Sequence, residues 1–302
     1  MFNQRKREES KMKKTKIIDI VQALETRGIK TGIGKGNGIN GDYIELTLRA
    51  GNSPVTTSFD IESVCRDMEN GKMLDDIIDS LISCLPGETE RKNKTSQSSD
   101  AFFYESYEEA RKQLTMKAIS IKRNRDLLKK IPHFDMEDIA FIFYLTVETN
   151  NEFFMLTDNK LMKHYNVEVE TLKRDAISLA LYERPLQINS MNDFFPIVDD
   201  EAPELYVCTA GRLDDQPNGA LVLAYPDFCK RVMDKLGGRP FYVLPSSIHE
   251  VLVTPADDKI MPHMLLEMVK SVNSEQVGPK ERLTDNVYYG DENGLRGLYN
   301  EI

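Results

Sequence analysis

Four residues in the stretch FYVLPSSIHEVLVTP (241–255) have side chains that could do chemistry: Ser246, Ser247, His249 and Glu250. A serine, an imidazole and a carboxylate are the parts of a hydrolase triad, and the last two groups also bind metal ions. A hydrolase further needs an oxyanion hole and an acid that orients the imidazole, and the sequence identifies neither. A hydrolase or metal-dependent enzyme centred on Ser247, His249 and Glu250 is therefore the alternative, not the favoured interpretation.

The local pattern around these residues favours a strand, a turn and a second strand. Ser247 and Glu250 match the S-x-x-E capping box, but the following EVLVTP is β-branched and ends in proline, so no helix is expected. We predict that the first strand ends at Pro245 and that the second begins near Ile248. Because side chains alternate along a strand, His249 is expected to face away from Glu250, which leaves no reaction centre.

Gly36–Gly41 formally match the dinucleotide fingerprint G-x-G-x-x-G. In a dinucleotide site these glycines follow a strand and open a helix, whereas here a helix is predicted before them and a strand after them. Gly34–Lys35 also fails as a phosphate-binding loop, because Gly36 occupies the place of the magnesium-binding hydroxyl. A hairpin tip or loop is favoured, and no cofactor is predicted.

The four histidines show no zinc-type spacing. His133 lies close in sequence to Asp135, Glu137 and Asp138, a set that would suit a divalent metal ion. Asp135 as a turn residue explains the same pattern more simply. No metal site is therefore predicted.

The elements that must position these residues fall into four segments. Residues 1–15 are predicted to be a disordered basic tail, 16–85 a small mixed α/β N-terminal unit and 86–102 a flexible linker. Residues 103–302 are predicted to be a helix followed by an α+β sheet domain. Since its strands arrive mainly as hairpins, the fold class is α+β, with an antiparallel sheet body and flanking helices.

Two features of the larger segment are specific enough to test. Apolar residues at helical spacing between 105 and 130 predict one long, basic, amphipathic helix with a solvated outer face. The runs ELYVCTA and GALVLAY flank Asn218–Gly219, and they predict two strands joined by a hairpin.

Composition limits the partners. The chain has 302 residues, a net charge of −10, and seven Lys/Arg against two Glu in residues 1–16. These 16 residues have a net charge of +5, so the rest of the chain has a net charge of −15. Since an acidic body repels phosphate backbones, nucleic acid is disfavoured as a partner. No apolar run has the length of a membrane span or a secretory signal, so no membrane association is predicted. The dispersed cysteines are typical of reduced thiols, and the cytoplasm is the expected location.

Without a complete catalytic set, the favoured function is binding to another protein. The stretch VDDEAPE (198–204) and the stretch LTDNVYY (283–289) offer carboxylates and tyrosines, of which tyrosine is enriched at interfaces. Asp285 and Tyr288 therefore join the candidate functional residues. The alternative for 283–289 is a strand or loop that seals the body.

Two motifs together resemble a known family. LPSSIHEV (244–251) is similar to the strand pair of an uncharacterised domain-of-unknown-function family of Gram-positive gut anaerobes, and VNSEQVGPKERLTDNVYY (272–289) is similar to its V-N-x-x-x-V-x-P-x-E-x-L-x-D-x-V-Y-Y segment. The resemblance extends over most of residues 17–290. It implies no activity, cofactor or catalytic residue, and the family's multi-copy accessory-gene setting implies a regulatory or accessory role.

Overall fold

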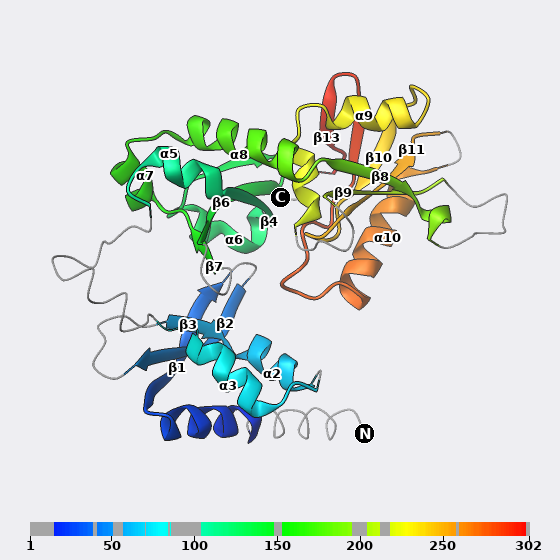
Figure 1. Cartoon of the computed structure of the whole chain (residues 1–302). Coiled ribbons are helices and arrows are strands. Elements are labelled where there is room, and N and C mark those ends of the chain that lie inside the picture. Colours follow the sequence, from blue (N-terminus) through cyan, green and yellow to red (C-terminus); the bar gives the residue numbers. More distant parts are fainter. Residues whose placement is uncertain are drawn as a thin grey trace, which may run out of the picture. The chain divides into compact units, whose positions relative to one another are not determined.

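The computed structural model describes residues 15–38, 41–50, 57–69, 71–83, 85, 104–147, 153–194, 204–211, 218–257 and 260–299 (Figure 1). The chain forms two compact units, residues 1–101 and 102–302. The predicted linker at 86–102 and, apart from Thr15, the predicted tail at 1–15 lie outside the described residues. Both units combine helices with antiparallel sheets, so the predicted α+β class is confirmed.

The first unit is a three-stranded antiparallel sheet with helices. Residues 15–26 are helical, and the helix ends before Gly28, whose φ of 77° lies in the left-handed region that favours glycine. Strands β1 (Ile29–Gly38), β2 (Gly41–Ala50) and β3 (Thr57–Asp60) are neighbours in that order, and α2 (Ile61–Glu69) and α3 (Leu74–Ser83) follow. The glycine-rich segment thus forms a β-hairpin. The fully buried core residues are Ile20, Leu24, Leu46, Leu48, Ile61 and Ile78.

The second unit begins with a sheet in the order β4–β6–β5, with β7 also paired to β6. Its strands are β4 (Leu114–Ser120), β5 (His133–Met136), β6 (Ile139–Val147) and β7 (Phe153–Leu156). The accompanying helices are α5 (Tyr107–Ala110), α6 (Ile121–Leu128), α7 (Asn159–Tyr165) and α8 (Val169–Glu183). Phe141 and Phe143 of β6 are fully buried and belong to the same core as Leu172 and Ala176 of α8.

The predicted long helix over 105–130 is wrong. The segment is a short helix, a single turn of 3-10 helix, strand β4 and helix α6. Leu114, Met116 and Ala118 are all buried, and β4 pairs with β6 without interruption from Leu114 opposite Leu145 to Ser120 opposite Ile139. Leu114 and Ala118 are four residues apart, a spacing that fits helix and strand alike. Pairing with β6 is what makes this segment a strand.

The second sheet of this unit has the order β13–β12–β10–β11–β9–β8. Its strands are β8 (Leu186–Ser190), β9 (Tyr206–Ala210), β10 (Phe241–Leu244), β11 (Val251–Pro255), β12 (Tyr288–Asp291) and β13 (Gly294–Gly297). Helices α9 (Phe228–Lys235) and α10 (Pro262–Glu275) accompany it (Figure 1, yellow and orange). Among the described residues, no helix is long and apolar enough to cross a bilayer.

The predicted hairpin around Asn218–Gly219 is also wrong. Residues after Asn218 form the 3-10 helix η3 (Gly219–Ala224), and β9 pairs with β8 and β11 instead. Residues 219–223 are buried on every side, so their continuous apolar run needs no strand alternation. Gly219 lies against Thr209 and the backbone oxygen of His249, where a side chain would collide with both. The Ala220 N–H donates to the oxygen of Ile248 over 3.2 Å, which fixes the start of η3.

Candidate functional site

The candidate residues between β10 and β11 lie in a loop that pairs with a distant segment. The N–H of Ile248 donates to the oxygen of Glu281 over 2.9 Å, and the N–H of Leu283 donates to the oxygen of Ser246, also over 2.9 Å. These bonds surround a single antiparallel bridge between Ser247 and Arg282. Strand β11 begins only at Val251, so the predicted start near Ile248 is wrong, because this pairing holds residues 246–248 away from β11's ladder.

Ser247 is buried, and its hydroxyl is bonded within the loop. Its Oγ accepts a hydrogen bond from the His249 backbone N–H over 3.0 Å, and the hydroxyl is hydrogen-bonded to the Glu250 carboxyl. Among the described residues, no hydrogen bond joins this hydroxyl to the His249 ring. A serine nucleophile needs a base that takes its proton. The arrangement closes a turn and does not form a Ser–His pair.

His249 and Glu250 share one acidic neighbour, Glu281. The His249 Nε2 lies 3.7 Å from Glu281 Oε1, and Glu281 also acts electrostatically on Glu250. The expected separation of His249 and Glu250 on opposite faces of a strand therefore does not hold. The reason is that residues 246–250 are a loop, whose side chains need not alternate.

The protonation of Glu250 reflects this setting. Burial raises the pKa of the Glu250 carboxyl, and Glu281 raises it further, while His249 and the Ser247 hydrogen bond oppose these effects. Within the described part of the chain, the His249 Nδ1 is buried without a hydrogen-bond partner. The loop thus holds an imidazole and two carboxyls close together, and its backbone bonds connect β9, η3 and residues 281–283.

Asp285 and Tyr288 belong to a second polar cluster. Asp285 Oδ1 accepts a hydrogen bond from Asn273 Nδ2 over 2.6 Å. The fully buried Tyr288 donates its hydroxyl to Asp138, and Thr284 donates to the same carboxylate. Burial raises the pKa of Tyr288 far above its ordinary value, and the Asp138 carboxylate adds to the shift. This cluster joins the β5–β6 turn to the second sheet, so it is a structural link between the unit's two sheets.

The structure also tests the sequence hypotheses on the stretch 283–289 and on the acidic residues near His133. Residues 283–289 include the fully buried Leu283, Val287 and Tyr288, so this stretch seals the body and offers little surface. In the stretch VDDEAPE, residues 198–203 lie outside the described residues. The acidic residues near His133 do not converge, since Asp138 turns to Tyr288 and only Asp135 approaches the ring, at 3.7 Å. No group of ligands suited to a metal ion occurs in the described residues.

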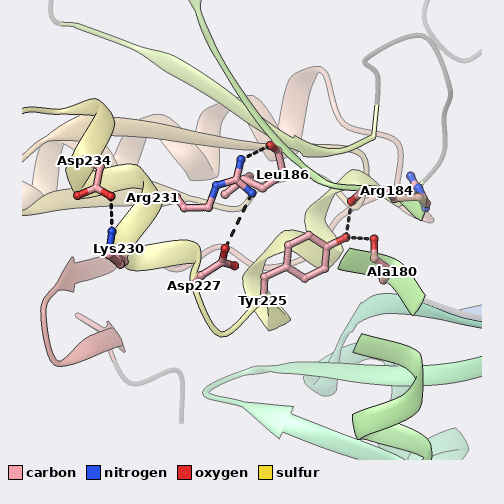
Figure 2. A network of polar contacts seen from close by, with 8 residues as sticks. All are labelled: Ala180, Arg184, Leu186, Tyr225, Asp227, Lys230, Arg231 and Asp234. Carbon is pink, nitrogen blue, oxygen red and sulfur yellow. Dashed lines mark hydrogen bonds and ion pairs between the residues drawn. The ribbon is translucent and has the colours of Figure 1, made fainter. Parts of the chain in front are cut away.

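A third polar network lies where α8, β8 and α9 meet, and Figure 2 shows its contacts. The Tyr225 hydroxyl donates to the oxygens of Ala180 at 3.3 Å and Arg184 at 2.6 Å, at the C-terminal end of α8, where the Ala180 oxygen also accepts the Arg184 N–H over 2.8 Å. Arg231 donates to the Leu186 oxygen over 2.8 Å. Burial raises the pKa of Tyr225 well above its ordinary value, so it stays protonated. This network caps a helix and offers no reactive group.

Three exposed methionines lie at the N-cap and on the first turns of α10. Met261, Met264 and Met268 have exposed fractions of 53%, 61% and 52%. On the adjoining side of the helix, Leu265 and Val269 are buried in a core with Tyr242 and Leu244 of β10 and with Val287, which precedes β12. We call Met261, Met264 and Met268 the methionine face. No sequence motif marked it, although the spacing of three and four residues was visible.

The chain belongs to DUF5688, a family of unknown function, whose model matches residues 15–292. That match covers both units and includes the 246–250 loop, the Asp138 cluster and the methionine face. Neither a curated protein nor a solved structure matches the chain.

Proposed function

We propose that this DUF5688 protein is a non-catalytic accessory protein of the cytoplasm that binds another protein through the methionine face of α10. The observation that carries this proposal is the exposure of three methionines on one flank of a helix whose neighbouring flank is buried. Exposed apolar groups that extend a packed face are typical of interaction sites. Methionine is unbranched and adaptable, and it is frequent on surfaces that bind protein helices.

The charge around the methionine face favours protein over nucleic acid. Glu267 and Glu275 lie on the solvent side of the same helix, and α10 has only one Lys and no Arg. The partner's contact segment is therefore apolar with basic residues at its margin. The cytoplasmic location is supported by the free thiols of Cys65, Cys208 and Cys229. Burial raises the pKa of Cys208 to about 12, so that thiol is inert.

The test compares tagged proteins in lysate from the producing cells. Replacing Met261, Met264 and Met268 by glutamine removes the apolar contacts and keeps similar side-chain volume. Met73→Gln is the matched control, because Met73 is 70% exposed but lies in the first unit. Wild type and control should enrich the same partner, and the triple variant should lose it by roughly tenfold or more. Equal enrichment by all three proteins, or by none, would contradict the proposal.

A further inference from the structure

Strand β1 presents a long open edge. It pairs with β2 over ten consecutive residue pairs, from Ile29 opposite Ala50 to Gly38 opposite Gly41. In the sheet order β1–β2–β3 its other side has no partner strand among the described residues. Every second N–H and C=O of an edge strand points away from its partner, so these groups of β1 have no strand partner among the described residues.

Two lysines are the protection against pairing that this edge strand carries. Proteins commonly block edge strands with proline, a bulge or several charges. β1 contains no proline, its register with β2 has no bulge, and its only charged residues are Lys30 and Lys35. The glycines at 32, 34, 36 and 38 leave Lys30 as the one side chain on their face of the strand. Apart from these two lysines, nothing in the strand hinders the approach of a further strand.

The other face of the hairpin carries exposed apolar side chains. Ile33 has an exposed fraction of 56% and Ile44 of 42%. Ile33 lies directly opposite Leu46, which is fully buried in the unit's core, and Ile44 is two residues from Leu46 on the same face. The apolar face of the sheet therefore extends from the buried core of the unit to the exposed Ile33 and Ile44.

We propose that β1 pairs with β1 of a second copy of this chain, antiparallel about a two-fold axis at Ile33. The two three-stranded sheets then form one six-stranded sheet. A two-fold axis perpendicular to the sheet keeps each face continuous, so Gly32 lies opposite Gly34 of the second copy on one face. On the other face Ile33 packs against Ile33 of the second copy, a favourable cross-strand pair.

Charge is compatible with this register. Lys35 lies opposite Thr31 of the second copy and Lys30 lies opposite Gly36, so no two lysines face each other. The contact is modest, since a ten-residue strand spans only about 33 Å. Stable interfaces bury about 800 Å² on each partner, so a reversible, concentration-dependent dimer is expected. This inference is independent of the methionine face and of its partner.

Sedimentation equilibrium of the full chain over a wide concentration range tests the proposal. Wild type should show a monomer–dimer equilibrium, and Ile33→Lys should raise its dissociation constant roughly tenfold or more. Ile18→Lys is the matched control, because Ile18 is 53% exposed in the same unit but lies outside β1. This control should dimerise like wild type, and thermal unfolding should show that both variants stay folded.

Amide hydrogen exchange locates the contact. In the dimer, the amides of β1 should gain protection relative to the dilute monomer. A chain that stays monomeric at every concentration overturns the proposal, and so does a dimer that Ile33→Lys leaves intact. Protection that appears on α10 instead of β1 also overturns it, since that result assigns self-association to the methionine face.

Discussion

The Oγ atom of Ser247 accepts a hydrogen bond from the backbone N–H of His249, so these two residues are joined through the main chain and not through the imidazole. Their side-chain types suit a hydrolase, but their geometry is that of a closed turn. The serine hydroxyl is held at the neighbouring Glu250 carboxyl. Hydrogen bonds of this loop connect it to β9, η3 and residues 281–283.

This geometry predicts that Ser247 is not a reactive nucleophile. A fluorophosphonate probe, which labels activated serines, should leave the folded protein unlabelled. Mass spectrometry of the peptide that contains residues 241–255 measures this directly. Labelling of Ser247 that disappears in His249→Ala would show that the imidazole activates it, and the non-catalytic interpretation would then be wrong.

Glu250→Gln should stabilise the protein near neutral pH. The folded-state pKa of Glu250 is raised above its unfolded value, so the stability associated with the protonated form is lost as the pH rises through the folded-state pKa. Glutamine stays neutral and can still accept from Ser247. Urea unfolding should show a gain at pH about 7 that disappears at pH about 4, below the unfolded pKa. Glu267→Gln, at an exposed site, should show no such pH-dependent gain.

Tyr288→Phe should destabilise the second unit. The change removes the hydroxyl that donates to Asp138 and leaves that carboxylate with one donor fewer. The expected loss in unfolding free energy is about 1–3 kcal/mol. Tyr289→Phe is the control, because Tyr289 is only half-buried, and its loss should stay within about 0.5 kcal/mol. Equal losses for the two variants would show that the Asp138 bond adds little stability.

Gly219→Ala should destabilise the protein far more than the addition of one methyl group suggests. A Cβ atom at position 219 would overlap the Thr209 side chain and the backbone oxygen of His249, and the backbone oxygen cannot rotate away. Overpacking of this kind costs about 1–3 kcal/mol, and we expect the upper end. Gly34→Ala provides the contrast, since its Cβ meets Glu45 only at ordinary contact distance. Thermal unfolding of the two variants gives the comparison, and a tolerated Gly219→Ala would contradict the close packing of η3.

Sequence alone predicted the elements that local signals specify. The glycine-rich segment is an example, since it was predicted as a hairpin tip or loop and forms the β1–β2 hairpin. Prediction failed where residues distant in the sequence determine the secondary structure. Residues 114–120 were predicted as helix but form a strand, because β6 pairs with them. Residues 219–224 were predicted as strand but form a 3-10 helix, which packs against Thr209 and is hydrogen-bonded to Ile248. The candidate site shows the same limit, since Tyr288 depends on Asp138, which is 150 positions away.

The most direct test of the proposed function is site-specific photo-crosslinking in the producing cells. A photoreactive amino acid at position 264 reports contacts of the methionine face. The same group at position 182 is the control, because Tyr182 is 86% exposed and lies on another helix, α8. The account predicts a crosslinked product with one other protein at position 264 and none at position 182. No product at 264, a product with a second copy of the chain alone, or equal yields at both positions would contradict it.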